Sequence, residues 1–140
     1  SKRLADTLVS AREVGNREQG IGISTTLDLA RIVEKVVGRR KGQIHPATRV
    51  FQALRIAVND ELGALSEGLE QIKDLIGKNG HILVISFHSL EDRIVKITFR
   101  KWQDMGFGEI VTKKPLVPGS VEIEQNSRSR SAKMRIFKIT

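Results

Sequence analysis

The short apolar run His81-Ile-Leu-Val-Ile-Ser-Phe87 constrains the fold of this chain more than any other feature. It is rich in β-branched residues, is bounded by turn residues and has no polar alternation. Such a run is typical of a strand buried on both faces of a parallel sheet. Helical patterns flank it over residues 51–76 and 89–102. The order of helix, buried strand and helix predicts a doubly wound α/β fold.

The two flanking helices carry signals for their bends and ends. From Phe51 to Ile76 apolar residues recur at spacings of three and four, which predicts one continuous helix with a candidate bend at Gly63 or Gly68. The segment Ser89-Leu-Glu-Asp92 matches a capping box, so we expect Ser89 to cap the following helix and Asp92 to complete the box.

The N-terminal part of the chain is predicted to be helical. Residues 1–12 have the apolar spacing of a helix, and we expect the chain to enter this helix midway, as a fragment would. Thr25-Thr-Leu-Asp28 is a second capping box and predicts a helix that stops at Gly38. Gly20-Ile-Gly22 follows no strand and lacks a third glycine, so it is a weak signal for a nucleotide. The basic turn over residues 39–42 suits a phosphate.

Two further strands are predicted near the C-terminus, over residues 108–113 and 133–140. The polar connection between them has about 19 residues, a length that usually marks a functional or mobile loop. Three strands are too few for a complete doubly wound sheet. We therefore expect the missing strands to come from upstream sequence or from another chain.

Charge and composition narrow the classes of function. The chain has 24 Lys and Arg against 16 Asp and Glu, a net charge of +8, and the excess is concentrated after residue 112. This distribution suits a polyanion such as RNA, with a solvated basic surface as the alternative. There is no cysteine, which excludes disulfides and thiol catalysis. The three histidines lack metal-ligand spacing, and no apolar run or signal peptide indicates a membrane. The sequence therefore predicts an intracellular protein without a metal site.

Two groups of polar residues are candidates for a site. His88 and Ser89 follow the predicted strand, where open α/β sheets bind ligands. A structural hydrogen-bonding role for His88 is an equal alternative. The second group steps by three and four along one polar side of a helix, as expected of a cleft or a surface for an RNA backbone, and consists of Arg49, Gln52, Arg55 and Asn59.

Long motifs make the sequence similar to a known family. Ile44-His-Pro-Ala-Thr-Arg-Val-Phe-Gln-Ala-Leu-Arg-Ile-Ala-Val-Asn-Asp-Glu-Leu62 and Val84-Ile-Ser-Phe-His-Ser-Leu-Glu-Asp-Arg-Ile-Val-Lys96 closely resemble the MraW/RsmH family. Asn126-Ser-Arg-Ser-Arg-Ser-Ala-Lys-Met-Arg135 resembles a third family motif. Ser127 stands where that motif has Pro and Ser129 where it has Ala, which predicts a looser turn.

The resemblance implies a methyltransferase that depends on S-adenosylmethionine and acts on the exocyclic amine of a cytidine in 16S-type small-subunit ribosomal RNA. It implies a class I, Rossmann-like sheet interrupted by a helical insertion. Residues 1–46 would end this insertion, and residues 47–140 would form the C-terminal half of the methyltransferase domain. The family's glycine-rich cofactor loop belongs to the other half, so no residue here is assigned to the cofactor.

The resemblance also implies roles for the candidate residues. His88 or Asn59 would orient the cytosine, and Ser89 and Gln52 would lie on the substrate side. The RNA backbone would be held by Arg49, Arg55, Arg128 and Arg130. We expect a cytoplasmic enzyme, with an organelle as the alternative location, whose partner is small-subunit rRNA or the small ribosomal subunit.

Two other classes of function compete with this one. The first is a catalytically inert RNA-binding or assembly fragment that lacks the cofactor loop. The second is a DNA-binding helix-turn-helix over residues 1–37, which is disfavoured because the intervening loop is long and the second helix is acidic.

Overall fold

A computed structural model of the chain describes residues 2–14, 22–38 and 44–140. Two compact units, Ser1–Asn59 and Asp60–Thr140, make up the chain, and each is described by itself. The predicted basic turn at residues 39–42 and most of the Gly20-Ile-Gly22 motif lie outside the described residues. Among the helices that are described, none is both long enough and apolar enough to cross a membrane.

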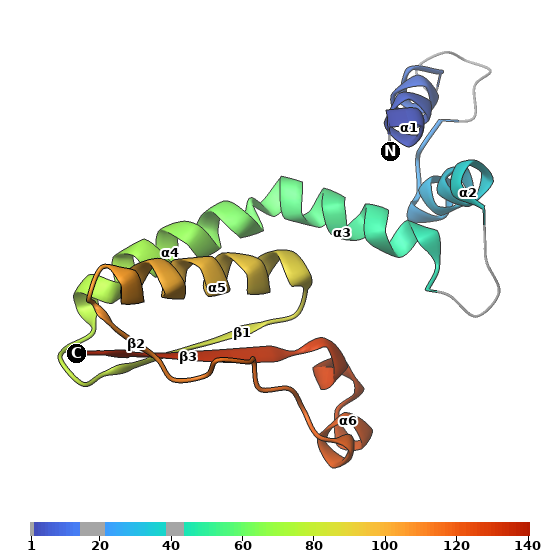
Figure 1. Cartoon of the computed structure of the whole chain (residues 1–140). Helices are drawn as coiled ribbons and strands as arrows, with labels where there is room; N and C mark the ends of the chain where they lie inside the picture. The colour runs from blue at the N-terminus through green and yellow to red at the C-terminus, as the bar shows by residue number, and fades with distance from the viewer. Residues whose placement is uncertain (1, 15–21, 39–43) are drawn as a thin grey trace. The chain divides into compact units, whose positions relative to one another are not determined.

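The first unit consists of three helices, α1 (Lys2–Val14), α2 (Thr26–Val37) and α3 (Pro46–Asn59) (Figure 1). The predicted capping box of α2 is confirmed. The Asp28 amide donates to Thr25 Oγ1 (3.2 Å), and the Thr25 amide donates to Asp28 Oδ2 (2.9 Å). The helix ends at Gly38, whose φ of 79° lies in the region that favours glycine. A small core of Leu29, Val33 and Ala47 holds the unit together.

The prediction of one continuous helix over residues 51–76 is wrong. Helix α3 ends at Asn59, and α4 (Glu61–Leu75) begins after Asp60, which has left-handed backbone angles (φ 48°, ψ 42°). Aspartate tolerates this conformation better than most residues. Gly63 contributes by leaving space, because a Cβ there would lie 2.6 Å from Asp60 Oδ1. The apolar spacing continues through the break, so periodicity alone does not reveal it.

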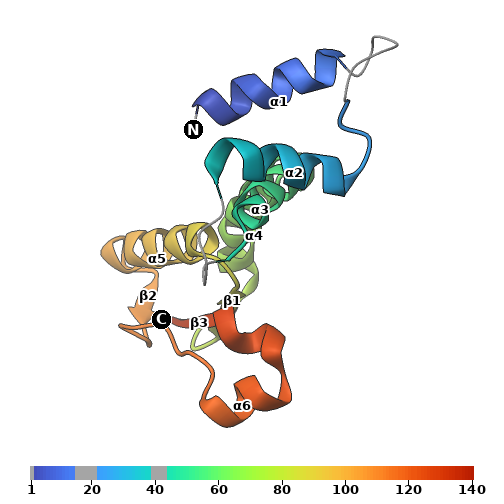
Figure 2. The ribbon, with the colours of Figure 1, turned by 90° about the vertical axis from the view of Figure 1, so that its right-hand side faces the viewer.

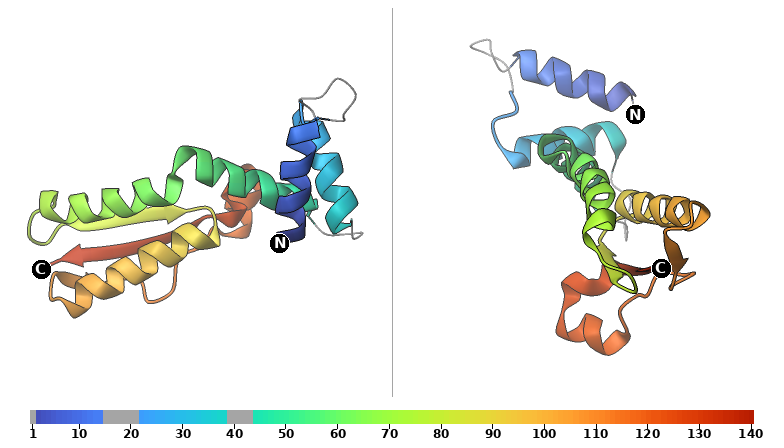
Figure 3. Two further views of the ribbon diagram at one scale, coloured as in Figure 1. Left: turned by 90° about the horizontal axis from the view of Figure 1, so that it is seen from above. Right: turned by 90° about the vertical axis from the view of Figure 1, so that its left-hand side faces the viewer.

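The second unit is a small α/β layer. Its strands are β1 (His81–Ser86), β2 (Gly108–Ile110) and β3 (Lys133–Ile139), in the order β1-β3-β2, with β3 antiparallel to both neighbours. Helices α4 and α5 (Ser89–Asp104) lie side by side on one face of the sheet (Figure 3).

The connection between β2 and β3 was predicted as a loop, and the structure corrects this. It contains the helix α6 (Ser120–Gln125) and the 3-10 helix η1 (Ser127–Ser131). Both lie near the start of β3, on the side of the sheet away from α5 (Figure 2). These helices are short, with 6 and 5 residues, so they leave little periodicity in the sequence.

The α/β class is confirmed, but β1 is not a strand of a parallel sheet buried on both faces. It pairs antiparallel with β3, and only its Ile82 and Ser86 are buried. The alternate residues Leu83 and Ile85 are 56% and 57% exposed. The apolar run predicts a strand whose two faces are both buried, whereas helices α4 and α5 cover only one face of the sheet.

Three aromatic rings form the centre of the second unit's core. Phe99, Trp102 and Phe137 are fully buried, and their ring centroids lie 5.2–5.5 Å apart. Tilted and edge-to-face rings at such distances attract one another beyond the effect of burial. Phe99 and Trp102 belong to α5 and Phe137 to β3, so the cluster fixes the helix on the sheet.

We predict that Phe137→Ala destabilises the second unit by about 3–5 kcal/mol, because it opens a cavity between two buried rings. Urea unfolding followed by the fluorescence of Trp102, the sole tryptophan, measures the change. The matched control is Phe87→Ala, which removes a half-exposed ring and should change stability by about 0.5 kcal/mol or less. Equal losses for the two variants would contradict the assignment of this core.

Candidate functional site

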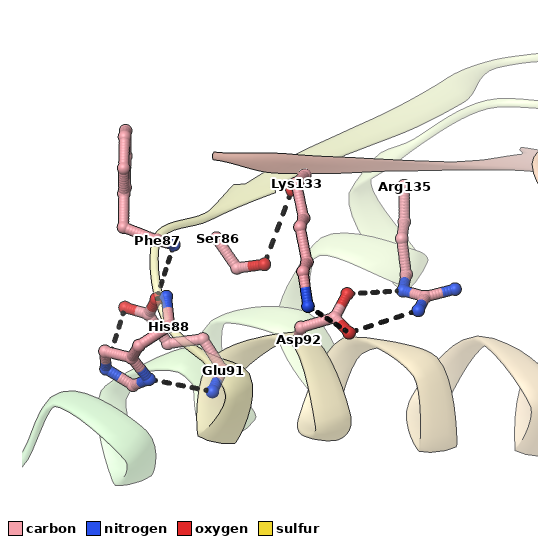
Figure 4. A network of polar contacts seen from close by, with 7 residues as sticks. All are labelled: Ser86, Phe87, His88, Glu91, Asp92, Lys133 and Arg135. Carbon is pink, nitrogen blue, oxygen red and sulfur yellow. Dashed lines mark hydrogen bonds and ion pairs between the residues drawn. The ribbon is translucent and has the colours of Figure 1, made fainter. Parts of the chain in front are cut away.

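The turn between β1 and α5 carries the predicted residues His88 and Ser89 (Figure 4 shows the first of them). His88, rather than Ser89, is the N-cap of α5. The Glu91 amide donates to His88 Nδ1 (3.2 Å), and Glu91 Oε2 accepts from the amides of Phe87 (2.8 Å) and His88 (3.2 Å). The predicted box is thus shifted by one residue. Ser89 becomes the first residue of the helix and is exposed.

This capping arrangement determines the tautomer of His88. Because Nδ1 accepts a hydrogen bond, the proton of the neutral imidazole is on Nε2. Nε2 is buried and has no hydrogen-bond partner in the described structure, although Glu91 Oε1 lies 3.5 Å away. The side chain as a whole is 9% exposed. His88 therefore has a structural role at the helix start and, in addition, one N–H group that remains to be satisfied.

Glu61, at the start of α4, completes a cluster with His88 and Glu91. One ligand atom from each lies within 4.8 Å of the others, a geometry that three metal ligands can adopt. The capping hydrogen bond disfavours a metal site, because it places the imidazole proton on Nε2. Nε2 could bind a cation only if the proton moved to Nδ1 and the hydrogen bond from the Glu91 amide were lost. The sequence did not predict this cluster, since Glu61 is distant from the other two along the chain.

A second polar group joins the start of α5 to the sheet. Asp92 accepts two hydrogen bonds from Arg135 of β3, at 2.7 Å from Nε and 3.2 Å from Nη2, and Lys133 Nζ lies 3.9 Å from its carboxylate (Figure 4). The side chains of Asp92 and Arg135 are only 13% and 9% exposed. Geometry of this kind, with two parallel bonds, is the strongest that a carboxylate and a guanidinium form.

This ion pair changes the acidity of the carboxyl group. The hydrogen bonds from Arg135 hold the pKa of Asp92 below its usual value of 3.8, and the positive charges of Arg135, Lys133 and Lys96 act in the same direction. Burial opposes them but does not prevail. Asp92 is therefore charged at neutral pH. It was predicted to complete the capping box, and it binds Arg135 instead.

Arg135 could have been found from the sequence. In β3 the residues Arg135, Phe137 and Ile139 alternate, so they share one face, and two of them are apolar. A cation on the buried face of a strand requires a counter-ion. Only the tertiary structure shows that Asp92 provides it.

Residues 126–132 of the third motif form a compact turn before β3, and residues 133–135 begin the strand. Asn126 Oδ1 accepts from the Arg128 amide (3.2 Å), and the hydroxyl of buried Ser129 donates to the Asn126 carbonyl (2.8 Å). The hydroxyl thus ties the turn together at a position predicted to loosen it. Arg128 and Arg130 are exposed on η1, and both are open to solvent.

The remaining predicted residues belong to the first unit. Helix α3 carries all four of them, so their spacing of three and four places them along one side, as expected. Arg49 is exposed and Gln52 is half-buried. Arg55 and Asn59 are exposed and take part in polar interactions. The structure therefore groups the candidates as two sets, one on α3 and one around the β1–α5 turn and η1.

Comparisons with known proteins match this chain along its whole length. The model of the MraW methylase family covers residues 1–140. The ribosomal RNA small subunit methyltransferase H of Leptospira interrogans is 48% identical over the whole chain, and that of Persephonella marina is 49% identical over 99% of it. The corresponding protein of a Sulfurihydrogenibium species is 55% identical over 81% of the chain.

The three-stranded sheet and the helices packed on it place the second unit in the α/β class of proteins. The chain belongs to the MraW methylase family. It spans 40–46% of the length of these curated relatives.

We predict that Asp92→Asn destabilises the second unit by about 3 kcal/mol, because it leaves the Arg135 charge buried without a counter-ion. The double variant Asp92→Leu with Arg135→Met should recover most of the loss. Chemical denaturation of the single and double variants measures both effects. Glu70→Gln, which breaks an exposed pair with Lys73, is the control and should change stability little. A double variant no more stable than the single one would contradict this account.

The same pair predicts a dependence on pH. A folded-state pKa below 3.8 means that the contribution of Asp92 is complete above the unfolded-state value and is lost as the pH falls through the folded-state value. The stability difference between the natural chain and Asp92→Asn should therefore be constant at neutral pH and shrink below pH 3.8. Denaturation at a series of acidic pH values measures it, and a constant difference throughout would refute the assignment.

Proposed function

We propose that this chain is the C-terminal part of an enzyme that transfers a methyl group from S-adenosylmethionine to the exocyclic amine of a cytidine in small-subunit ribosomal RNA. The observation that carries the proposal is the 48% identity, over the whole chain, to a protein named ribosomal RNA small subunit methyltransferase H. Under this proposal the enzyme acts in the cytoplasm.

The uncovered surface of the sheet supports a longer enzyme over an inert fragment. Leu83 and Ile85 are more than half exposed and pair with Ile136 and Met134 of β3, so four apolar residues share the face away from α5. In the described chain β1 also has only one paired edge. Such features are rare on a complete soluble domain. We propose that upstream strands and helices complete a Rossmann-like sheet here, with residues 1–46 as the end of a helical insertion.

The strand-to-helix turn of the second unit does not fit the cofactor. In the described part of the chain, the turn at Phe87 and His88 is where a strand runs directly into a helix, and it contains no glycine. Its amides already donate to Glu91 Oε2, so they cannot cradle an anionic group. We therefore propose that the binding residues for S-adenosylmethionine lie in the part of the enzyme outside this chain.

The proposed substrate contacts follow the two sets of candidates. His88 or Asn59 orients the cytosine, with Ser89 and Gln52 beside the substrate. The exposed guanidinium groups hold the RNA backbone and belong to Arg49, Arg55, Arg128 and Arg130. Because such enzymes depend on placing the amine correctly, small displacements of these groups should be costly.

A chimaeric enzyme tests the proposed function. The matched segment of the Persephonella marina relative is replaced by this chain, and unmethylated small ribosomal subunits are the substrate. We expect S-adenosylmethionine-dependent formation of N4-methylcytidine, measured by mass spectrometry of the digested RNA, with the intact relative as control. A folded chimaera that binds the cofactor but methylates no cytidine would disprove the proposal.

Calorimetric titration of S-adenosylmethionine into the 140-residue chain provides a second test. We expect no binding by the folded chain, since the amides of Phe87 and His88 at its strand-to-helix turn already donate to Glu91. Micromolar binding would show that the cofactor residues have been placed in the wrong part of the enzyme.

Variants of His88 in the chimaera separate its two roles. His88→Ala removes both the cap and Nε2, whereas His88→Asn retains an acceptor for the Glu91 amide and removes only the imidazole. If His88 orients the cytosine, both variants should lower kcat by about 100-fold while the affinity for S-adenosylmethionine is unchanged. Full turnover by His88→Asn would reduce the role of His88 to capping the helix and leave Asn59 as the orienting residue.

A further inference from the structure

Three cations form a stripe along one flank of α5. Arg93, Lys96 and Arg100 are spaced by three and four residues, so their side chains follow one another on the same side of the helix. All three are exposed and line an open groove of about 710 Å³. We call these three residues the α5 stripe; none of them belongs to the sets of RNA-binding candidates above.

The carboxylates around the α5 stripe do not neutralise it. Asp92, one turn from Lys96, is already bound by Arg135 and Lys133. Asp104 lies at the far end, in the last turn of the helix. Within the described part of the chain, no carboxylate comes within 4.0 Å of the three cationic groups. The groove therefore keeps a local excess of positive charge.

Lys101 also lines the groove and is, by contrast, a paired cation. Its Nζ lies 3.8 Å from Glu70 of α4, and Glu70 also binds Lys73 at 2.9 Å. Helix α4, which carries Glu70, lies beside α5 (Figure 3). Of these four cations in the described structure, Lys101 is thus the one that has a carboxylate within 4.0 Å, and the α5 stripe keeps its charge available to a ligand.

We propose that the α5 stripe binds the phosphate groups of an RNA strand, at nucleotides other than the one that is methylated. The inference rests on the proposed rRNA substrate and adds a surface to it. Guanidinium groups bind phosphates through two parallel hydrogen bonds, and phosphate contacts dominate affinity for nucleic acids. The stripe extends for about 10 Å along the helix, enough for a few successive phosphates. The exposed side chains of Ile97 and Met105 border the groove and can contact ribose or base carbons.

The test measures binding of the 140-residue chain to a short, fluorescently labelled single-stranded RNA by anisotropy, at a series of salt concentrations. In the stripe variant Arg93, Lys96 and Arg100 are each replaced by Gln. We expect its plot of log affinity against log salt to be flatter by about 2, since each lost contact to single-stranded RNA removes about 0.7 from the slope. Circular dichroism and Trp102 fluorescence establish that each variant is folded.

A matched control loses the same charge elsewhere. It replaces three exposed or half-exposed lysines of α2, the α4–β1 turn and β3 by Gln, namely Lys35, Lys78 and Lys138. We expect its salt slope to equal that of the natural chain. Equal slopes for the stripe variant and the control would overturn the inference, because only net charge would then matter. Displacement of the RNA by polyglutamate as effectively as by unlabelled RNA would also overturn it.

The result of the RNA-binding experiment can be distinguished from the result of the methylation experiment. Methylation is measured on the chimaera, whereas the salt slope is measured without cofactor or turnover. A flatter slope for the stripe variant, together with a chimaera that methylates no cytidine, would support the RNA surface and refute the methyltransferase proposal. Methylation by the chimaera with an unchanged slope for the stripe variant would refute the inference alone.

Discussion

The ion pair between Asp92 and Arg135 is the interaction on which the rest of the second unit depends. It joins the first turn of α5 to β3 across 43 positions of sequence, with both side chains nearly buried. Removing either partner would leave the other charge buried without a counter-ion. This lowers the stability of the fold far more than the loss of an exposed ion pair does. The pair therefore holds the β1–α5 turn through Asp92 and, through Arg135 of β3, the turn of residues 126–132.

Helix α5 uses each of its sides for a different purpose. Phe99 and Trp102 pack against Phe137 of β3, and Lys101 contacts Glu70 of α4. The remaining flank carries the α5 stripe, and the N-terminal end carries His88 and Ser89. A rigid helix with a buried aromatic anchor is a suitable support for a surface that must keep its geometry against an RNA strand. The proposed function and the proposed RNA surface thus draw on the same structural element.

Much of the fold could be predicted from local sequence, and the errors have physical reasons. Capping at Thr25 and Asp28 was predicted correctly, because a capping box involves neighbours within one turn. Capping at Ser89 was wrong by one residue, since an imidazole nitrogen serves as acceptor as well as a hydroxyl does, and Arg135 claims the carboxylate of Asp92. The candidate residues after β1 and along α3 come from the sequence, and their role in a site stays a prediction. Glu61 and Arg135 were not among the residues that the sequence singled out.

The sequence by itself determined the positions of the three strands, helices α2 and α5, the basic character and, through long motifs, membership of the MraW methylase family. These properties depend on local spacing and composition, which the chain carries without being folded. Only the tertiary structure decided that β1 pairs antiparallel with β3, that His88 is a cap with its proton on Nε2, and that Asp92 is bound by Arg135. Each of these depends on contacts between residues that are distant in the sequence, or on competition between groups for one hydrogen-bond partner. Residue spacing along the sequence does not predict such contacts.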